Sequence, residues 1–153
     1  MRTKYSFITL FSLLLMFCFV ATSIAQPANT PPTQTSAGKT TVIKKLSPKE
    51  AYDLVLSKKN ATNFVILDVR TPEEFESGHV EGAININYNS ENFVEELNKL
   101  DKAKSYLVYC RTGRRSGDTV GIMTKQGFGE LYRIDGDISK WKSQNFPVVK
   151  GTK

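Results

Sequence analysis

The chain has 153 residues, of which 40% are hydrophobic and 24% are charged. This composition is typical of a globular protein and the length suits one domain, so a wholly disordered or fibrous chain is excluded. The formal net charge is +6, but Arg2 and Lys4 lie in a segment that we expect to be removed, which leaves about +4. The other lysines are scattered and mostly interleaved with acidic residues, unlike the concentrated basic face of a nucleic-acid-binding protein. We therefore expect no nucleic-acid partner.

Residues 1–25 have the pattern of a secretory signal peptide. Arg2 and Lys4 give a positively charged start, an apolar run covers 7–20, and small residues lead up to Ala25. The apolar run, about 14 residues long, is shorter than the roughly 20 residues that a membrane-spanning helix needs, although retention as an anchor is the alternative. We expect cleavage after Ala25, export to a bacterial periplasm or out of the cell, and no stable membrane insertion of the mature chain.

The next segment, 26–41, is rich in Pro, Thr, Ser, Ala, Asn and Gln and has no apolar periodicity. Such a segment buries too little apolar surface to offset the entropy of ordering, so we expect a flexible linker. The folded domain should then cover 42–149. We find no sign of an obligate interface in it and expect a monomer.

Helix-like and strand-like segments alternate within 42–149. Capping boxes with proline at the first helical position predict helix starts at 47–50 and at 71–74. Apolar stripes at helical spacing predict further helices over 93–100, 115–126 and 138–143, and continuous apolar runs predict strands over 64–69, 83–86, 105–109 and 131–134. This alternation indicates an α/β fold with a mainly parallel sheet covered on both faces.

Polar residues follow two of the predicted strands. Asp68 and Arg70 come at the end of one strand, and Cys110 follows another. Ligands of open α/β sheets bind beyond the carboxyl ends of the strands, so a site is expected there. Removal of the leader would take Cys18 away and leave Cys110 as the only thiol. A single cysteine in an exported chain is buried and inert, paired between chains, or kept for its reactivity.

The loop after Cys110 favours the reactive interpretation. The segment 110–116 reads CRTGRRS and joins a strand to a helix. Backbone N–H groups of such a loop, together with the positive end of the helix, can converge on an anion. Arg111, Arg114 and Arg115 add positive charge, which should favour the thiolate at neutral pH. A buried structural cysteine is the alternative, but three arginines within five residues make an apolar burial site hard to build.

Four segments in this order resemble the single-domain rhodanese-like sulfurtransferases: 67–75, 78–84, the loop 110–116, and 136–141 together with 147–148. The resemblance covers nearly all of 42–149 and implies a twisted, five-stranded, mainly parallel sheet flanked by helices. The chain departs from the family pattern at Asp137, where a second glycine is usual, and at Asn145, also often glycine. We expect these departures to alter local turns rather than the chemistry.

The resemblance also implies sulfur transfer through a persulfide on Cys110, the expected catalytic residue. A donor such as thiosulfate would give up its outer sulfur and release sulfite, and an acceptor such as cyanide or a thiol would then collect that sulfur. Anion binding is expected from the side chains of Arg111 and Arg115 and from the N–H groups of 112–116. Asp68 and Arg70 should brace the loop without touching substrate. The expected substrate-binding residues are Arg111, Thr112, Gly113, Arg114, Arg115 and Ser116.

The same loop bears on three alternative functions: a cysteine phosphatase, an arsenate reductase and a non-catalytic module. Cysteine-dependent tyrosine phosphatases place their arginine after five intervening residues, where this chain has Ser116, whereas Arg115 follows only four. An arsenate reductase would need a second cysteine to resolve its intermediate. A non-catalytic binding or regulatory module of this fold often lacks the cysteine or the loop charge, and this chain keeps both.

His79, the single histidine, lies in a segment that is structural in the family. We expect a hydrogen-bonded turn residue there rather than a general base. The sequence shows no metal-ligand spacing and no nucleotide-binding glycine fingerprint, so we expect neither metal nor other cofactor.

Overall fold

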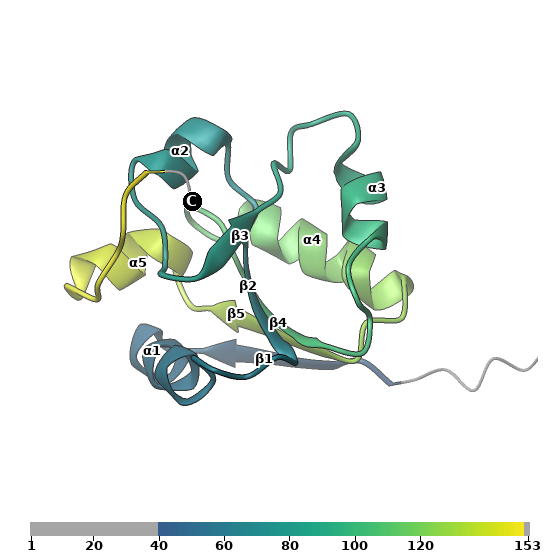
Figure 1. Ribbon diagram of the computed structural model, residues 1–153, viewed down its shortest axis with the longest axis horizontal. Coiled ribbons are helices and arrows are strands. Elements are labelled where there is room, and N and C mark those ends of the chain that lie inside the picture. Colours follow the sequence, from purple (N-terminus) through teal and green to yellow (C-terminus); the bar gives the residue numbers. More distant parts are fainter. Residues whose placement is uncertain (1–39, 152–153) are drawn as a thin grey trace, which may run out of the picture. The chain divides into compact units, whose positions relative to one another are not determined.

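Five strands form one sheet in the computed structural model, which describes residues 40–151 (Figure 1). They are β1 (Val42–Leu46), β2 (Phe64–Asp68), β3 (Ala83–Asn85), β4 (Ser105–Tyr109) and β5 (Glu130–Ile134). Their order is β1-β5-β4-β2-β3, and every neighbouring pair is parallel. The expected α/β fold with a five-stranded parallel sheet is therefore confirmed. The expected leader and nearly all of the expected linker lie outside the described residues.

Helices cover both faces of this sheet (Figure 1). They are α1 (Pro48–Ser57), α2 (Pro72–Glu76), α3 (Phe93–Asn98), α4 (Arg114–Lys125) and α5 (Asp137–Ser143). One core cluster joins the sheet to α1 and α5 and includes Ala51, Ile138 and Trp141. The other joins it to α3 and α4 and includes Leu97 and Met123. Among residues 40–151, none of the helices has the length and apolar character needed to cross a membrane.

The central strand β4 shows why its sequence is continuously apolar. Tyr106 and Val108 belong to the core cluster beneath α3 and α4, whereas Leu107 and Tyr109 belong to the cluster beneath α1 and α5. Successive side chains of a strand point to opposite faces. A strand covered on both faces therefore needs apolar residues at every position.

Both predicted capping boxes are present. The hydroxyl oxygens of Ser47 and Thr71 accept hydrogen bonds from the backbone N–H groups of Glu50 and Glu74, and each Glu carboxylate accepts in return from the N–H group of its capping residue. Proline occupies the start of both helices, α1 and α2. These caps satisfy N–H groups that a helix start otherwise leaves without partners.

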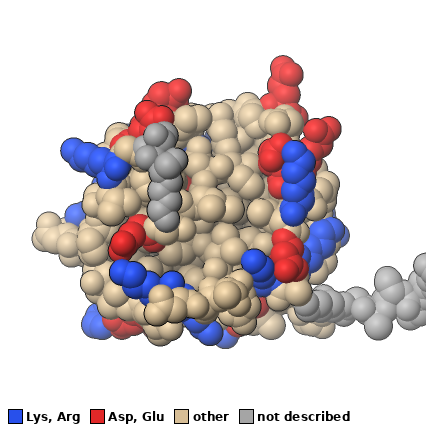
Figure 2. Space-filling view, in the orientation of Figure 1, with Lys and Arg blue, Asp and Glu red and all other residues tan. Residues whose placement is uncertain are grey.

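The strand β1 has no counterpart among the predicted elements. It is an edge strand that pairs only with β5, and Val42 and Ile43 are about half exposed. Lysines occupy its centre, so its sequence lacks the continuous apolar run by which the other strands were predicted. In the view of Figure 2, charged side chains of both signs lie interspersed around the edge of the molecule, and no large patch of one sign is visible.

Candidate active site

The segment after β4 turns sharply at Cys110 and enters α4. Gly113 lies just before α4 with a φ of 115°, a left-handed conformation that suits glycine. This turn brings the backbone N–H group of Gly113 within 3.2 Å of the Cys110 Sγ, to which it donates. A backbone donor aimed at the sulfur is the kind of contact that stabilises negative charge on it.

Cys110 itself is buried, with 1% of its surface exposed, and forms part of the core cluster beneath α3 and α4. The expectation that the neighbouring arginines would prevent burial is therefore wrong. The same cysteine nevertheless lines a pocket of about 260 Å³, whose other lining residues are Asn89, Arg111, Thr112, Arg114 and Arg115. Cys110 thus lies between the apolar core and a polar pocket, because its three neighbouring arginines extend away from the core.

Arg115 lines this pocket from a fixed position. Its two terminal nitrogens donate to the two carboxylate oxygens of Glu74 at 2.7 and 3.0 Å. These hydrogen bonds are the main reason that the pKa of Arg115 is raised, and the nearby Cys110 adds to the effect. The pKa of Glu74 is lowered, first by its bonds with Arg115. Since Glu74 also caps α2, one carboxylate joins the α2 start to the loop.

Arg111 and Arg114 differ in their surroundings. Arg114 is exposed, lies 3.5 Å from the carboxylate of Asp118, and has its guanidinium 5.7 Å from the ring centre of Tyr88. Arg111 is exposed, and no ion pair involves it within residues 40–151. Of the three loop arginines, Arg111 is therefore the one whose charge no carboxylate offsets.

Ser116, one of the expected substrate-binding residues, is not among the residues that line the pocket. Its side chain is fully buried, and its hydroxyl donates to the carbonyl oxygen of Gly113 at 3.2 Å. Gly113 is also not among the pocket-lining residues, although its N–H group reaches the sulfur. Besides Cys110, the loop residues that line the pocket are Arg111, Thr112, Arg114 and Arg115.

Asp68 and Arg70 form a buried ion pair behind the loop. Their side chains are 0% and 3% exposed, and the Arg70 Nε lies 2.9 Å from both carboxylate oxygens. A terminal nitrogen of Arg70 also donates to the carbonyl oxygen of Gly78 at 3.0 Å. Neither residue lines the Cys110 pocket. The pair joins the end of β2 to the segment before β3.

Three residues near Cys110 were missed at the sequence level. Asn89 lines the Cys110 pocket, and Asp137 of α5 and Arg133 of β5 contact the segment 110–113. The Asp137 carboxylate accepts a hydrogen bond from the Cys110 N–H group at 2.5 Å, and Asp137 is 1% exposed with a φ of 52°. An Arg133 nitrogen donates to the Gly113 carbonyl oxygen at 2.6 Å. The expectation that Asp137 alters only a local turn is wrong, because its carboxylate holds the backbone of Cys110. Its departure from the family pattern was the signal that could have found it.

His79 has the structural role that was expected. Its Nδ1 lies 2.9 Å from the carbonyl oxygen of Phe75, and the two rings stack with centres 3.6 Å apart. The backbone of His79 also pairs with Val149. The imidazole is buried and does not line the Cys110 pocket.

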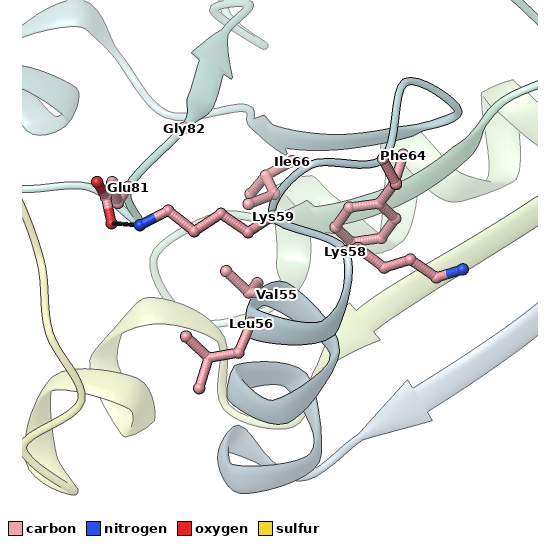
Figure 3. Close-up of a pocket in the computed structure, with 9 residues that line it drawn as sticks. Val55, Leu56, Lys58, Lys59, Phe64, Ile66, Glu81 and Gly82 are labelled. Carbon is pink, nitrogen blue, oxygen red and sulfur yellow. Dashed lines mark ion pairs between the residues drawn. The ribbon is translucent and has the colours of Figure 1, made fainter.

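A second pocket, of about 270 Å³, lies at the other end of the sheet (Figure 3). Phe64 at the start of β2 and Gly82 just before β3 line it, together with Val55 and Leu56 of α1, and a Lys59–Glu81 ion pair of 3.6 Å spans its edge. Its volume is close to that of the Cys110 pocket, so volume does not show which of the two pockets is the functional site. The chemistry does, because no cysteine lines this pocket and it lies at the amino ends of the strands, opposite to the usual position of ligand sites.

Comparisons with known proteins identify several relatives of this chain. The thiosulfate sulfurtransferase GlpE of Shewanella oneidensis is 32% identical over 85 residues, which are 56% of this chain and 82% of that protein. GlpE of Coxiella burnetii is 32% identical over 102 residues, which are 67% of this chain and 90% of that protein. The crystal structure of a rhodanese-related protein from Thermoplasma volcanium matches with a TM-score of 0.58 and 27% identity, over 69% of this chain and 97% of that one.

The family assignment follows from a match that contains all the site residues described above. Residues 47–144 match the family described as Rhodanese, Rhodanese-like domain. This range runs from the cap of α1 to the end of α5 and includes Cys110, its loop and the residues behind it. The chain therefore belongs to the rhodanese-like domain family, and its curated relatives include sulfurtransferases.

Proposed function

We propose that this protein is a sulfurtransferase that takes sulfane sulfur from a donor such as thiosulfate onto Cys110 and passes it to an acceptor, cyanide or a thiol. The observation that carries the proposal is the contact at the sulfur: the Gly113 N–H group donates to Sγ, and Arg111, Arg114 and Arg115 line the same pocket. A thiolate and an anionic donor can share such a pocket because its donors and cations offset both charges.

The transfer takes two balanced steps. The Cys110 thiolate attacks the outer sulfur of thiosulfate, the S–S bond of the donor breaks, and sulfite leaves with the electron pair, so that Cys110 carries a persulfide. The acceptor then attacks the outer sulfur of that persulfide. The new S–S bond breaks, the Cys110 thiolate is restored, and cyanide leaves as thiocyanate or a thiol leaves as its own persulfide.

Each loop residue has a separate part in this proposal. The Gly113 N–H group would stabilise charge on Sγ, and Arg111, which has no paired carboxylate in the described structure, would meet the charge of the donor. Arg115 would add positive charge from the position that Glu74 fixes. Asn89, Thr112 and Arg114 complete the lining of the pocket.

The alternatives receive less support from this site. A phosphatase arginine must wrap around a tetrahedral phosphate, but Arg115 comes one residue earlier than in that motif and is held by both oxygens of Glu74. A non-catalytic module would need no N–H group aimed at the cysteine sulfur. Arsenate reduction lacks a resolving cysteine among the described residues, where Cys110 is the free cysteine.

The test is persulfide formation followed by mass spectrometry. Incubation with thiosulfate should add one sulfur atom to the wild-type protein and none to Cys110→Ser, and subsequent cyanide should remove the sulfur as thiocyanate. A protein that gains no sulfur from thiosulfate, polysulfide or an organic persulfide would favour the binding-module alternative. A sulfur adduct that persists in Cys110→Ser would contradict the role of Cys110.

The cellular location belongs to the same proposal. The predicted leader 1–25 supports export, and the absence of an identified interface in the sequence supports a monomer. Fractionation of the producing cells should place the mature chain, starting at Gln26, outside the cytoplasm, and light scattering should give the mass of one chain. Recovery of the full-length chain in the membrane fraction would instead support the anchor alternative.

A further inference from the structure

A further hollow, distinct from the pocket of Figure 3, adjoins the Cys110 pocket and has no part in the transfer described so far. It has a volume of about 320 Å³ and is lined by Arg70, Glu74, Ser77, Arg111, Ile138, Ser139 and Lys142. Arg111 lines both this hollow and the Cys110 pocket. The Glu74–Arg115 ion pair also joins them, because Glu74 lines the hollow and Arg115 lines the pocket. A molecule reacting at Cys110 could therefore reach the hollow past Arg111.

The charges that line the hollow leave a positive excess. Arg70 is paired with Asp68, and Glu74 is paired with Arg115. Arg111 and Lys142 have no carboxylate within ion-pair distance in residues 40–151. Two cations without a counter-charge thus face one small cavity, which is a suitable arrangement for binding an anion.

The surroundings of Lys142 support this description. Its pKa is lowered, chiefly by desolvation and then by the charges of Arg70 and Lys150, with Asp68 acting in the opposite direction. Its Nζ lies only 3.4 Å from where a side chain on Gly78 would begin, so the lysine lies closely over that glycine. The ammonium group is therefore held beside other positive charges, and an arriving carboxylate would relieve that repulsion.

The hollow suits the acceptor better than the donor. Thiosulfate is compact, and both its charge and its outer sulfur must lie in the Cys110 pocket for the first step. An organic thiol has its reacting sulfur at one end and can carry a charged group several bonds away. We propose that the Arg111–Lys142 hollow binds the carboxylate of an acceptor thiol whose sulfur lies at Cys110. This inference rests on the proposed sulfur transfer.

The reaction of such an acceptor follows the second step given above. Its thiolate attacks the outer sulfur of the Cys110 persulfide, the S–S bond to Cys110 breaks, and the acceptor leaves as a carboxylate-bearing persulfide. The hollow takes no part in bond breaking. It lowers the free energy of the bound acceptor and orients the thiolate, so its effect belongs to the second-order rate constant kcat/KM for the acceptor.

The experiment compares acceptors of matched length that differ only in charge. The pairs are 3-mercaptopropionate with 3-mercaptopropanol and 6-mercaptohexanoate with 6-mercaptohexanol, each assayed by sulfite release from saturating thiosulfate. The readout is the ratio of kcat/KM for the acid to that for the alcohol. Because exposed ion pairs are weak, the wild-type protein should prefer the acid of at least one pair by about two- to fivefold.

Lys142→Gln should bring this ratio close to one, and Lys142→Glu should reverse the preference. Lys142 is exposed and belongs to neither core cluster, so neither change disturbs the core. Lys125→Gln is the matched control, because it removes the same charge from an exposed position at the far end of α4 and should leave the ratio as in the wild type. Added salt should also lower the wild-type ratio.

The outcomes separate the two proposals. The protein could turn over cyanide and thiols but show the same acid-to-alcohol ratio of kcat/KM in the wild type, Lys142→Gln and Lys142→Glu. That result would overturn the carboxylate site and leave the proposed sulfur transfer intact. Equal loss of the preference in Lys142→Gln and Lys125→Gln would also overturn it, since net charge alone would then explain the effect. Absence of sulfite release with cyanide and with every thiol would overturn the proposed function and the hollow with it.

Discussion

Replacement of Asp137 should separate two contributions to the loop, a hydrogen bond and a backbone conformation. Asp137 accepts from the buried Cys110 N–H group at 2.5 Å and has a φ of 52°. Asp137→Ala leaves that N–H group without a partner, a loss of about 1–3 kcal/mol. It also places a residue with no polar side chain in the left-handed region, at about 1 kcal/mol more. We expect a total loss of about 2–4 kcal/mol in the free energy of unfolding.

Two further variants at this position divide that total. Asp137→Gly removes the hydrogen bond but tolerates the positive φ, so it should lose less than alanine. Asp137→Asn keeps an acceptor oxygen and tolerates the conformation, so it should remain closest to the wild type. The assay is urea unfolding, with the rate of persulfide formation measured in parallel. An alanine variant as stable as the asparagine variant, with an unchanged rate, would refute the reasoning.

Two other changes test the supports of the loop. Glu74→Gln removes the charge that binds Arg115 and should lower the free energy of unfolding by about 1 kcal/mol at neutral pH. The Glu74 pKa is lowered below its ordinary value of 4.5, so the stability that the ionised carboxylate contributes is complete above pH 4.5 and is lost as the pH falls below it. The difference in free energy of unfolding between wild type and Glu74→Gln, measured with urea, should therefore shrink at low pH. A difference that stays constant with pH would contradict this. Gly113→Ala would place a methyl group 3.3 Å from the Asp137 carboxylate at a φ of 115° and should lose at least about 1 kcal/mol. Gly82→Ala is the control, because φ is 80° there and no neighbouring group lies within 4 Å of the added methyl group, so this variant has the backbone strain without the crowding. If both variants lose the same free energy of unfolding, crowding at Gly113 is excluded.

The fold could be predicted to the extent that each element carries a local signal. The strands β2 and β4 are buried on both faces and therefore show continuous apolar runs, and both capping boxes follow directly from the sequence. The strand β1 carries no such signal. It is held by hydrogen bonds to the backbone of β5, distant in the chain, and Lys44 and Lys45 remain exposed at this edge of the sheet.

The site was predictable only as far as the loop sequence reaches. Cys110 and its arginines are adjacent in the chain, and the order of strand, loop and helix gives their place at the edge of the sheet. Asp137 and Arg133 come from α5 and β5, respectively, so their contacts with the loop depend on strand order. Arg133 lies within a strand on the same side as Leu131, which faces the core beneath α4. A cation at such a position is a sign of a buried polar contact that sequence reasoning could have used.

The four arginines around the loop show that cation count alone is a poor guide to substrate binding. Arg133 donates to the Gly113 carbonyl oxygen, Arg115 is bound by Glu74, and Arg114 lies near Asp118. The contacts of Arg133 and Arg115 hold parts of the site in place, and the carboxylates near Arg115 and Arg114 offset part of the charge of these two arginines. Arg111 has no carboxylate partner in residues 40–151 and lines both the Cys110 pocket and the Arg111–Lys142 hollow. Substitution of Arg111 should therefore affect donor and acceptor together, whereas substitution of Lys142, which lines only the Arg111–Lys142 hollow, should affect the acceptor alone.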